Sequence, residues 1–345
     1  MPQWWRPEQL AARRDRLERR GRILAALRGF FAARGFVEVD TPALQVSPGL
    51  EPHLRAFATE WHDPDRAAPV RRYLHTSPEY AMKKLLVAGL PRIWQLAHVF
   101  RDGERSPVHH PEFTMLEWYR SGASWRDLAE ECRALLATCQ EAVGAAHLAW
   151  RARRADARGP WQYLSVAEAF RRFCGIDLLA TAPDPLQPRF DLLAAAAAAV
   201  GVAPHPGDDW EALYFRIFLE RIEPRLGLGA PTILHDYPLA MAALARRSPE
   251  DPRTAERFEV YVCGLELANA FGELTDAAEQ RARLRADQAK KAALYGETYP
   301  IDEDFLAALA HGMPASAGIA LGFDRLVMLL TGAADITEVL WAPVC

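Results

Sequence analysis

The segment EFTMLEWYR (residues 112–120) combines an acid with aromatic residues at the spacing of a β-strand. Successive side chains of a strand point to opposite faces, so Phe113, Met115, Glu117 and Tyr119 would share one face. An acid and a phenol make a poor hydrophobic core. The same face would suit a purine ring and a cationic substrate. The exposed face of an edge strand is the alternative, and this segment by itself leaves both open.

The elements that must position this strand follow from periodicity and from helix caps. Leu10, Leu17, Leu24, Leu27 and Phe31 share one helical face over residues 8–34, and Gly35 ends that helix. The Leu10, Leu17 and Leu24 face fits a core better than a subunit interface. Further along the chain, the patterns predict a strand over 35–44 that stops at Pro42, a helix over 77–89 with Ser77 as N-cap and Pro78 as N1, strands over 92–101 and 112–120, a helix over 124–143 capped by Ser124, a hairpin over 257–271 that turns at Cys263 and Gly264, a helix over 275–296, and a strand leading into a helix over 318–332.

These helices and strands do not alternate regularly, and the strand pairs resemble antiparallel hairpins. This arrangement favours an α+β fold over a Rossmann fold. Residues 145–255 give the weakest patterns, and we expect a mostly helical insertion there, within one domain spanning residues 1–345. The sequence contains no GxxxxGK[ST] motif, so a bound nucleotide would be held by arginines and metal rather than by a Walker loop.

Composition argues against a dedicated nucleic-acid binder. The chain has 345 residues, 25% of them charged, and a net charge of −4. The densest basic run, Arg13 to Arg22, also carries Asp15 and Glu18, which is typical of a solvated helix face rather than an RNA contact. We therefore expect no stable nucleic-acid partner.

The five cysteines form no CxxC pair, which favours a reducing cytoplasm over a disulfide framework or a zinc site. The N-terminus lacks the apolar region of a signal peptide, and no apolar run reaches the roughly 18 residues that span a bilayer. We expect a cytoplasmic protein without a membrane partner.

Three segments, in the expected order, resemble the signature motifs of class II aminoacyl-tRNA synthetases. GFVEVDTPAL (35–44) resembles motif 1 with its terminal Pro42, FRDGERSPVHHPEFTMLEWYR (100–120) resembles motif 2 in its lysyl form, and GIALGFDRL (318–326) resembles motif 3. The similarity is greatest to the family of lysyl-tRNA synthetase paralogues that attach lysine or (R)-β-lysine to elongation factor P. The resemblance implies a class II catalytic core, an antiparallel sheet flanked by helices, without an anticodon-binding domain.

The resemblance implies that Arg101 and Arg325 are catalytic residues that act on ATP. Arg101 would hold the α-phosphate and stabilise its developing charge. Arg325 would stack on adenine and reach the γ-phosphate, which a planar guanidinium allows, and Phe113 would lie under adenine. An ion pair between Arg325 and Asp324 is the structural alternative. The other positions implied for ATP are Asp102, Gly103, Glu104, His110, Glu266, Leu267 and Gly322, while Gly318 and Gly322 would leave room for a ligand.

Three glutamates, Glu259, Glu266 and Glu273, follow one another at seven-residue spacing. The resemblance implies that Glu259 and Glu266 bind Mg²⁺ ions that bridge the ATP phosphates; Mg²⁺ prefers a few carboxylates together with phosphate oxygens. Strict alternation would place Glu266 and Glu273 on opposite faces, so we expect a bend near residues 270–272. Without the resemblance, the three acids would fit a solvated hairpin face.

The resemblance also implies a pocket for the amino acid. Glu79 and Glu273 would bind a side-chain ammonium, whose burial requires opposite charge, and Tyr119 would add a hydrogen bond. A capping box with Ser77 is the other role open to Glu79. The remaining substrate positions are Ser77, Pro78, Glu117, Asn269 and Ala320. Ser77 and Ala320 stand where lysyl-tRNA synthetases usually have alanine and glycine, which favours β-lysine without deciding between it and α-lysine.

Two departures from the family pattern affect adenine binding. Motif 2 often begins Arg-x-Glu, whereas this chain has Arg101-Asp102-Gly103-Glu104, and His110 stands where the family has asparagine. A metal site at His109 and His110 has little support, because adjacent residues on a strand point apart.

The predicted reaction is attack of the substrate carboxylate on the α-phosphorus of ATP, followed by aminolysis of the acyl-adenylate. Only about 34 residues precede motif 1, and they form a helix rather than an anticodon-binding barrel, so tRNA is a poor acceptor. The resemblance implies a lysine side chain of elongation factor P as acceptor, and motif 1 implies a homodimer. Two alternatives stay open: a truncated lysyl-tRNA synthetase-like enzyme with another acceptor, and a non-catalytic regulatory paralogue.

Overall fold

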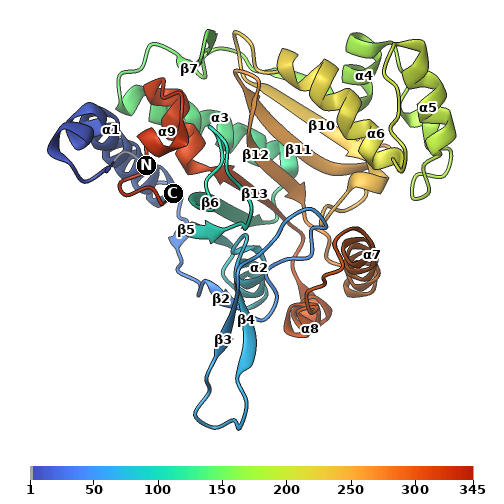
Figure 1. The fold of residues 1–345 in the computed structure, drawn as a ribbon, viewed down its shortest axis with the longest axis horizontal. Coiled ribbons are helices and arrows are strands. Elements are labelled where there is room, and N and C mark those ends of the chain that lie inside the picture. Colours follow the sequence, from blue (N-terminus) through green and yellow to red (C-terminus); the bar gives the residue numbers. More distant parts are fainter. Residues whose placement is uncertain (1–2, 345) are drawn as a thin grey trace.

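The centre of the protein is an eight-stranded sheet, which the computed structural model shows within the described residues 3–344 (Figure 1). Its six inner strands pair antiparallel, and the two outermost pairings, β1 with β5 and β9 with β10, are parallel. The strands are, in spatial order, β1 (Val37–Glu38), β5 (Arg92–Phe100), β6 (Glu112–Ser121), β13 (Ser316–Gly322), β12 (Leu265–Gly272), β11 (Thr254–Val262), β10 (Thr232–Pro238) and β9 (Gln162–Ser165). The α+β prediction with a mainly antiparallel sheet is confirmed.

Helices cover both faces of the sheet. One face packs against α1 (Pro7–Ala32), α3 (Trp125–Ala142) and α9 (Phe323–Thr331). The opposite face packs, near β5 and β6, against α2 (Glu79–Val87), α7 (Ala277–Tyr295) and α8 (Glu303–Gly312). At the far edge, beyond β10, lie α4 (Val166–Cys174), α5 (Phe190–Ala199) and α6 (Trp210–Ile217), as Figure 1 shows.

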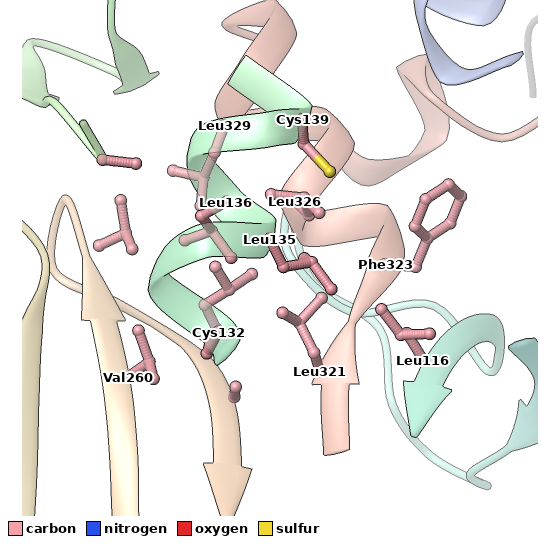
Figure 2. Close-up of a cluster of buried hydrophobic side chains, with 14 of the residues drawn as sticks. Leu116, Cys132, Leu135, Leu136, Cys139, Val260, Leu321, Phe323, Leu326 and Leu329 are labelled. Atoms are coloured by element: carbon pink, nitrogen blue, oxygen red, sulfur yellow. The ribbon is translucent and has the colours of Figure 1, made fainter. Parts of the chain in front are cut away.

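The largest hydrophobic core lies where α3 and α9 pack on the sheet. Figure 2 shows Leu135 and Leu136 of α3 facing Leu326 and Leu329 of α9, and all four side chains are fully buried. Amphipathic spacing places Leu135 and Leu136 on the buried side of α3. The burial of leucine side chains supplies most of the favourable free energy of such a core. This face of the sheet is therefore apolar and closed.

The predicted N-cap of α3 is confirmed, and α7 has a cap at each end. Ser124 and Asp127 form a capping box at the start of α3, and α7 runs from an Asp276 N-cap to Gly296 in the left-handed conformation. The α2 prediction was wrong by one residue, because Pro78 itself is the N-cap. The Ser77 hydroxyl accepts a hydrogen bond from the Glu79 N–H at 3.1 Å, but no capping box forms.

The N-terminal helix divides its leucines between core and surface. Leu17, Leu27 and Phe31 are buried, whereas Leu10 is 40% exposed. The basic run on α1 contacts protein: Arg20 pairs with Asp324 of α9, and Arg16 pairs with Glu338 at 3.2 Å. The predicted solvated face thus covers only part of that run.

Two sequence predictions need correction. The segment 35–44 forms two short strands rather than one, because Pro42 separates β1 from β2 (Leu44–Gln45). The strand β2 joins a separate small sheet with β4 (Val70–Leu74) and β3 (Ala58–Trp61), whose hairpin projects at the bottom of Figure 1.

The second correction concerns the bounds of the mostly helical insertion predicted at residues 145–255. Their helices fall within 166–225, where α4, α5 and α6 are followed by a π-helical segment (Phe218–Ile222), with short 3-10 segments at Leu179–Thr181 and Glu223–Arg225. Strands β9 and β10 on either side belong to the main sheet, and β7 (Leu148–Trp150) pairs with β8 (Arg153–Ala155). Since β9 pairs with β10, and β10 with β11, the helical part connects two neighbouring strands of the main sheet. Two further 3-10 segments lie at Leu239–Met241 and Ile336–Glu338.

Four cysteines, Cys132, Cys139, Cys174 and Cys263, are buried and free, and Cys345 lies outside the described residues. Within residues 3–344, no helix combines the length and the apolar character that crossing a membrane requires.

The α3–α9 core should dominate stability. We expect Leu136→Ala to lower the free energy of unfolding by about 2–5 kcal/mol, since the mutation leaves a cavity between two helices and the sheet. The control Leu294→Ala, at a side chain of α7 that is 52% exposed, should change it by less than about 0.5 kcal/mol. Urea unfolding followed by circular dichroism measures both. Equal effects of the two mutations would contradict this assignment of the core.

Candidate active site

The face of the sheet opposite the α3–α9 core forms the floor of a cavity of about 400 Å³. On β6, Phe113, Met115, Glu117 and Tyr119 all line it, as strand alternation predicts. The strand register extends this floor sideways, because Ala320 of β13 lies between Glu117 of β6 and Asn269 of β12. The intervening residues of β6, Leu116 and Trp118, point into the core.

A β-bulge at Leu267 brings the acids of β12 to this floor. Tyr261 of β11 pairs with Glu266, and the preceding Val260 pairs with Ala268, so Leu267 has no partner on β11. An extra residue shifts the alternation by one, which places Glu266 on the same face as Asn269 and the later Glu273. Pairing with β13 stays regular through Gly272, so the bend predicted at residues 270–272 was wrong.

One end of the cavity carries two arginines. The Arg101 guanidinium carbon lies 5.1 Å from the centre of the Phe113 ring, and its nearest carboxylate, Glu104, is 3.7 Å away. The Arg101 Nε is buried without a hydrogen-bond partner. A buried N–H group without a partner costs free energy unless a ligand accepts from it. Asp102 and Gly103 stand outside the lining of the cavity.

Three acceptors hold the Arg325 side chain. It donates to the backbone oxygens of Glu266 at 2.8 Å and Val108 at 3.2 Å, and to His109 Nε2 at 2.7 Å. Burial and the neighbouring Arg325 lower the pKa of His109, which keeps the imidazole neutral and able to accept.

The structural alternative for Arg325, an ion pair with Asp324, was wrong. Asp324 pairs instead with Arg20 and accepts a hydrogen bond from the Thr114 N–H at 2.7 Å. This pairing leaves the guanidinium of Arg325 on the cavity side of α9.

His110 lines the cavity, but its ring is already engaged. Its Nδ1 lies 2.5 Å from the carbonyl oxygen of Glu112, and its Nε2 lies 2.7 Å from that of Val344. The neighbouring His109 has the polar contact with the arginine end. The residues between 3 and 344 contain no group of three or more His, Cys, Asp or Glu that could hold a metal.

Behind the arginines lie Glu266 and Glu259. Burial, followed by the charge of Glu259, raises the pKa of Glu266 to about 7. Glu259 is buried outside the cavity lining, and its two oxygens accept from Arg257 and from the Tyr261 hydroxyl, each at 2.6 Å. Two such carboxylates raise each other's free energy unless a cation lies nearby.

The other end of the cavity contains four glutamates, Glu51, Glu79, Glu117 and Glu273. Glu117 accepts from the Ser77 hydroxyl at 2.6 Å and from the Tyr119 hydroxyl at 2.8 Å. Glu79 and Glu273 both lie 2.5 Å from the ammonium of Lys83. Pro78 lies beside this end, but lines a separate small pocket behind it.

Burial is the main cause of the raised pKa values of the glutamates at this end of the cavity. Burial and the charge of Glu79 raise the pKa of Glu117 to about 8, although the Ser77 and Tyr119 hydroxyls favour its ionised form. Burial likewise raises the pKa of Glu273 to about 7, with the charge of Lys83 opposing the shift. A cation entering this end would favour ionisation of these carboxyls.

The structure therefore brings most of the predicted site residues to one cavity, and leaves four of them outside its lining. Those that line it are Ser77, Glu79, Arg101, Glu104, His110, Phe113, Glu117, Tyr119, Glu266, Leu267, Asn269, Glu273, Ala320, Gly322 and Arg325. Those outside are Pro78, Asp102, Gly103 and Glu259.

Several residues at the cavity escaped the sequence analysis. Lys83 had a detectable signal, because it stands four residues after Glu79 on a predicted helix. Arg257, two residues before Glu259, was detectable by strand alternation. Glu211 and Phe215 of α6 gave no signal, since they come from the part of the chain with the weakest patterns.

Glu117 should make stability depend on pH. Its pKa rises from 4.5 to about 8 on folding, so stability is full below pH 4.5 and falls as pH rises towards 8. Glu117→Gln removes this titration, and we expect a flatter dependence, by up to about 1.4 kcal/mol per pH unit. Denaturant unfolding without ligands at pH 6, 7 and 8 measures the slope. Glu60→Gln, at an exposed position of β3, should keep the wild-type slope, and an unchanged slope in Glu117→Gln would refute the assignment.

Comparison with known proteins agrees with this geometry. The family model described as tRNA synthetases class II (D, K and N) matches residues 9–344. A protein of Edwardsiella ictaluri named elongation factor P–(R)-β-lysine ligase is 41% identical over 336 residues, which cover 97% of this chain and 96% of that protein. Proteins with the same name from Erwinia tasmaniensis and Vibrio cholerae are 41% and 40% identical, and cover 97% and 94% of this chain and 96% and 94% of their own lengths. The chain belongs to the class II (D, K and N) tRNA synthetase family, and within it to the group that contains the elongation factor P–(R)-β-lysine ligases.

Proposed function

We propose that the protein is a ligase that uses ATP to activate (R)-β-lysine, or lysine, as an acyl-adenylate. It then transfers the acyl group to a lysine side chain of elongation factor P. The names of its relatives support this activity. The observation that carries the proposal is a single cavity with two arginines at one end and four glutamates at the other.

The arginine end suits ATP. Arg101 offers a buried N–H without a partner beside the Phe113 ring, as a residue that contacts the α-phosphate over an adenine platform would. Arg325 is held by backbone oxygens and His109, so its orientation precedes ligand binding. Preorganised charges of this kind stabilise a developing negative charge without the cost of reorienting water.

The donor set fits Mg²⁺ that is shared with ATP. Glu266 is buried beside a second glutamate, and each oxygen of Glu259 retains a lone pair beyond its contact with Arg257 or Tyr261. Two carboxylates with phosphate oxygens satisfy the preference of Mg²⁺ for oxygen ligands. When bound, the metal would neutralise charge on the phosphates of ATP.

The carboxylate end suits a diamino acid. We propose that Glu79 and Glu273 bind the side-chain ammonium and that Glu117, Ser77 and Tyr119 surround the other amino group. Asn269 and Ala320 flank Glu117 across the strands of the floor. Ser77 and Ala320 at this end favour β-lysine over lysine.

The first step joins the substrate carboxylate to ATP. A carboxylate oxygen attacks the α-phosphorus, the bond to the β-phosphate oxygen breaks, and pyrophosphate leaves. Positioning and arginine charge are sufficient, because the nucleophile is already ionised. In the second step the neutral acceptor amine attacks the acyl carbon, AMP leaves with the bonding electrons, and the amine proton passes to solvent.

We also propose a homodimer formed around motif 1. Val37 of β1, an edge strand of the main sheet, is 49% exposed, and Leu44 and Val46, in and just after the edge strand β2 of the small sheet, are 42% and 46% exposed. Edge strands with exposed apolar side chains favour pairing with another chain. We further propose that residues 1–345 act as one catalytic domain in the cytoplasm, without a stable nucleic-acid partner.

Removal of Arg325 should abolish activation. We expect Arg325→Ala to reduce lysine-dependent or β-lysine-dependent exchange of pyrophosphate into ATP by at least about 100-fold, because the adenylate-forming transition state loses a positioned charge. Arg126→Ala is the control, since Arg126 is exposed and pairs with Glu250 on the surface. Near-normal exchange by Arg325→Ala would refute its role.

Acceptor identity needs a paired assay. The wild-type protein should transfer labelled lysine or β-lysine to elongation factor P and leave tRNA unlabelled. Labelling of tRNA alone would favour a truncated synthetase, and absence of exchange with either amino acid would favour a regulatory paralogue.

Gly318 should be required for the amino-acid end. A Cβ at this position would overlap the Tyr119 ring and a carboxylate oxygen of Glu273, so the space belongs to these two side chains rather than to the ligand. We expect Gly318→Ala to lower kcat/KM for the amino acid by about 10- to 100-fold, because displaced contact groups lose their alignment. Gly29→Ala on α1, where a Cβ would meet no atom within 4 Å, is the control. A value within twofold of wild type for Gly318→Ala would contradict this reasoning.

A further inference from the structure

Lys83 lies between Glu79 and Glu273, the two glutamates predicted to bind the substrate ammonium, and no sequence motif gave it a role. Its side chain is 1% exposed, and its ammonium lies 2.5 Å from Glu79 Oε1 and 2.5 Å from Glu273 Oε2. Glu79 and Lys83 stand four residues apart on α2, and Glu273 follows the end of β12. The two carboxylates assigned to the substrate are therefore already joined by a cation of the protein.

This lysine stays charged. Burial lowers its pKa, but the charges of Glu273 and Glu79 more than offset burial and raise the pKa above its ordinary value. A buried ion of this kind is stable only with well-placed partners, and the removal of one partner leaves an uncompensated charge.

The charges at this end of the cavity can be counted. Four carboxyls lie at this end, those of Glu51, Glu79, Glu117 and Glu273, and Lys83 supplies one positive charge to the pair formed by Glu79 and Glu273. Carboxyl groups therefore remain in excess where the two ammonium groups of a diamino acid would lie while its carboxylate faces the arginine end. Without Lys83, the repulsion between Glu79 and Glu273 would favour the uptake of a proton by one of them.

The contacts of Glu273 leave room for a second cation. Its side chain is 1% exposed, Oε2 contacts the ammonium of Lys83, and Oε1 has no hydrogen-bond partner. A glutamate with one unused oxygen in the wall of a cavity can bind an ammonium from the cavity while its other oxygen stays paired with Lys83.

We propose that Lys83 is a positioning residue that fixes Glu79 and Glu273 as an ionised pair and thereby adapts the cavity to a substrate with two amino groups. This inference rests on the proposed function. The other ionisable groups around the pair come from several elements. They are Glu117 and Tyr119 of β6, Glu51 of the loop between β2 and β3, and Arg246, which pairs with Glu256. None of them replaces Lys83 between the two carboxylates.

The neighbouring Lys84 provides a matched control. It stands on the same helix and pairs with Asp302 at 3.0 Å and Asp304 at 2.9 Å, outside the cavity lining. Lys84→Met and Lys83→Met remove the same charge from α2, but only Lys83→Met changes the pair at the cavity.

The test is the KM for lysine and for β-lysine in pyrophosphate exchange, measured at pH 7 and pH 9 beside the KM for ATP and the Tm. We expect Lys83→Met to raise the amino-acid KM at pH 7 by about tenfold relative to wild type, the equivalent of one weakened charge contact. At pH 9 this ratio should shrink, because the carboxyl that takes up a proton without Lys83 ionises again. The KM for ATP should stay within twofold, and Lys84→Met should change only the Tm.

Two further variants separate charge from packing. Lys83→Gln carries the same expectation as Lys83→Met if the methionine variant does not fold, and Lys83→Arg, which retains the charge, should restore most of the wild-type KM and its pH profile. An amino-acid KM within twofold of wild type at pH 7 in the neutral variants, with a lowered Tm, would overturn the proposal and leave Lys83 a stabilising residue only. Failure of the proposed function is distinct, since the wild-type protein would then show no exchange with either amino acid.

Discussion

The burial of glutamates on one face of the central sheet is the constraint on which this structure depends. Glu117, Glu259, Glu266 and Glu273 all point to that face, and desolvation disfavours the charged forms of Glu117, Glu266 and Glu273. Partners compensate them locally: hydroxyls for Glu117, Arg257 and Tyr261 for Glu259, and Lys83 for Glu273. The compensation is incomplete, because the pKa values of Glu117, Glu266 and Glu273 remain raised, and a cationic ligand would favour their ionised forms.

Such a face is possible because the other face of the sheet carries the stability. The leucines of α3 and α9 close that side with an apolar core, so the cavity side needs no continuous hydrophobic packing (Figure 2). Strand alternation then sends neighbouring residues of β6 to opposite roles, with Trp118 in the core and Glu117 and Tyr119 at the cavity. One strand thus serves stability and ligand binding at the same time.

The proposed reaction follows from the separation of charge along this cavity. The arginine end attracts phosphates and the carboxylate end attracts amines, so ATP and a diamino acid would meet with the substrate carboxylate facing the α-phosphate. The helical part at residues 166–225 adds Glu211 and Phe215 to the rim, at a distance along the chain from every recognisable motif. Membership of the class II (D, K and N) family and the names of the relatives agree with this separation of roles.

The sequence by itself determined the local features: the faces of β6, and the turn at Cys263 and Gly264, where both residues have positive φ. These depend on residues close in the chain, whose periodicity and turn chemistry act over a few positions. Only the tertiary structure decided the bulge at Leu267, the ion pair of Arg20 with Asp324, and the position of Lys83 against Glu273. Each of these depends on strand register or on packing between distant segments, and local patterns do not encode such long-range pairings.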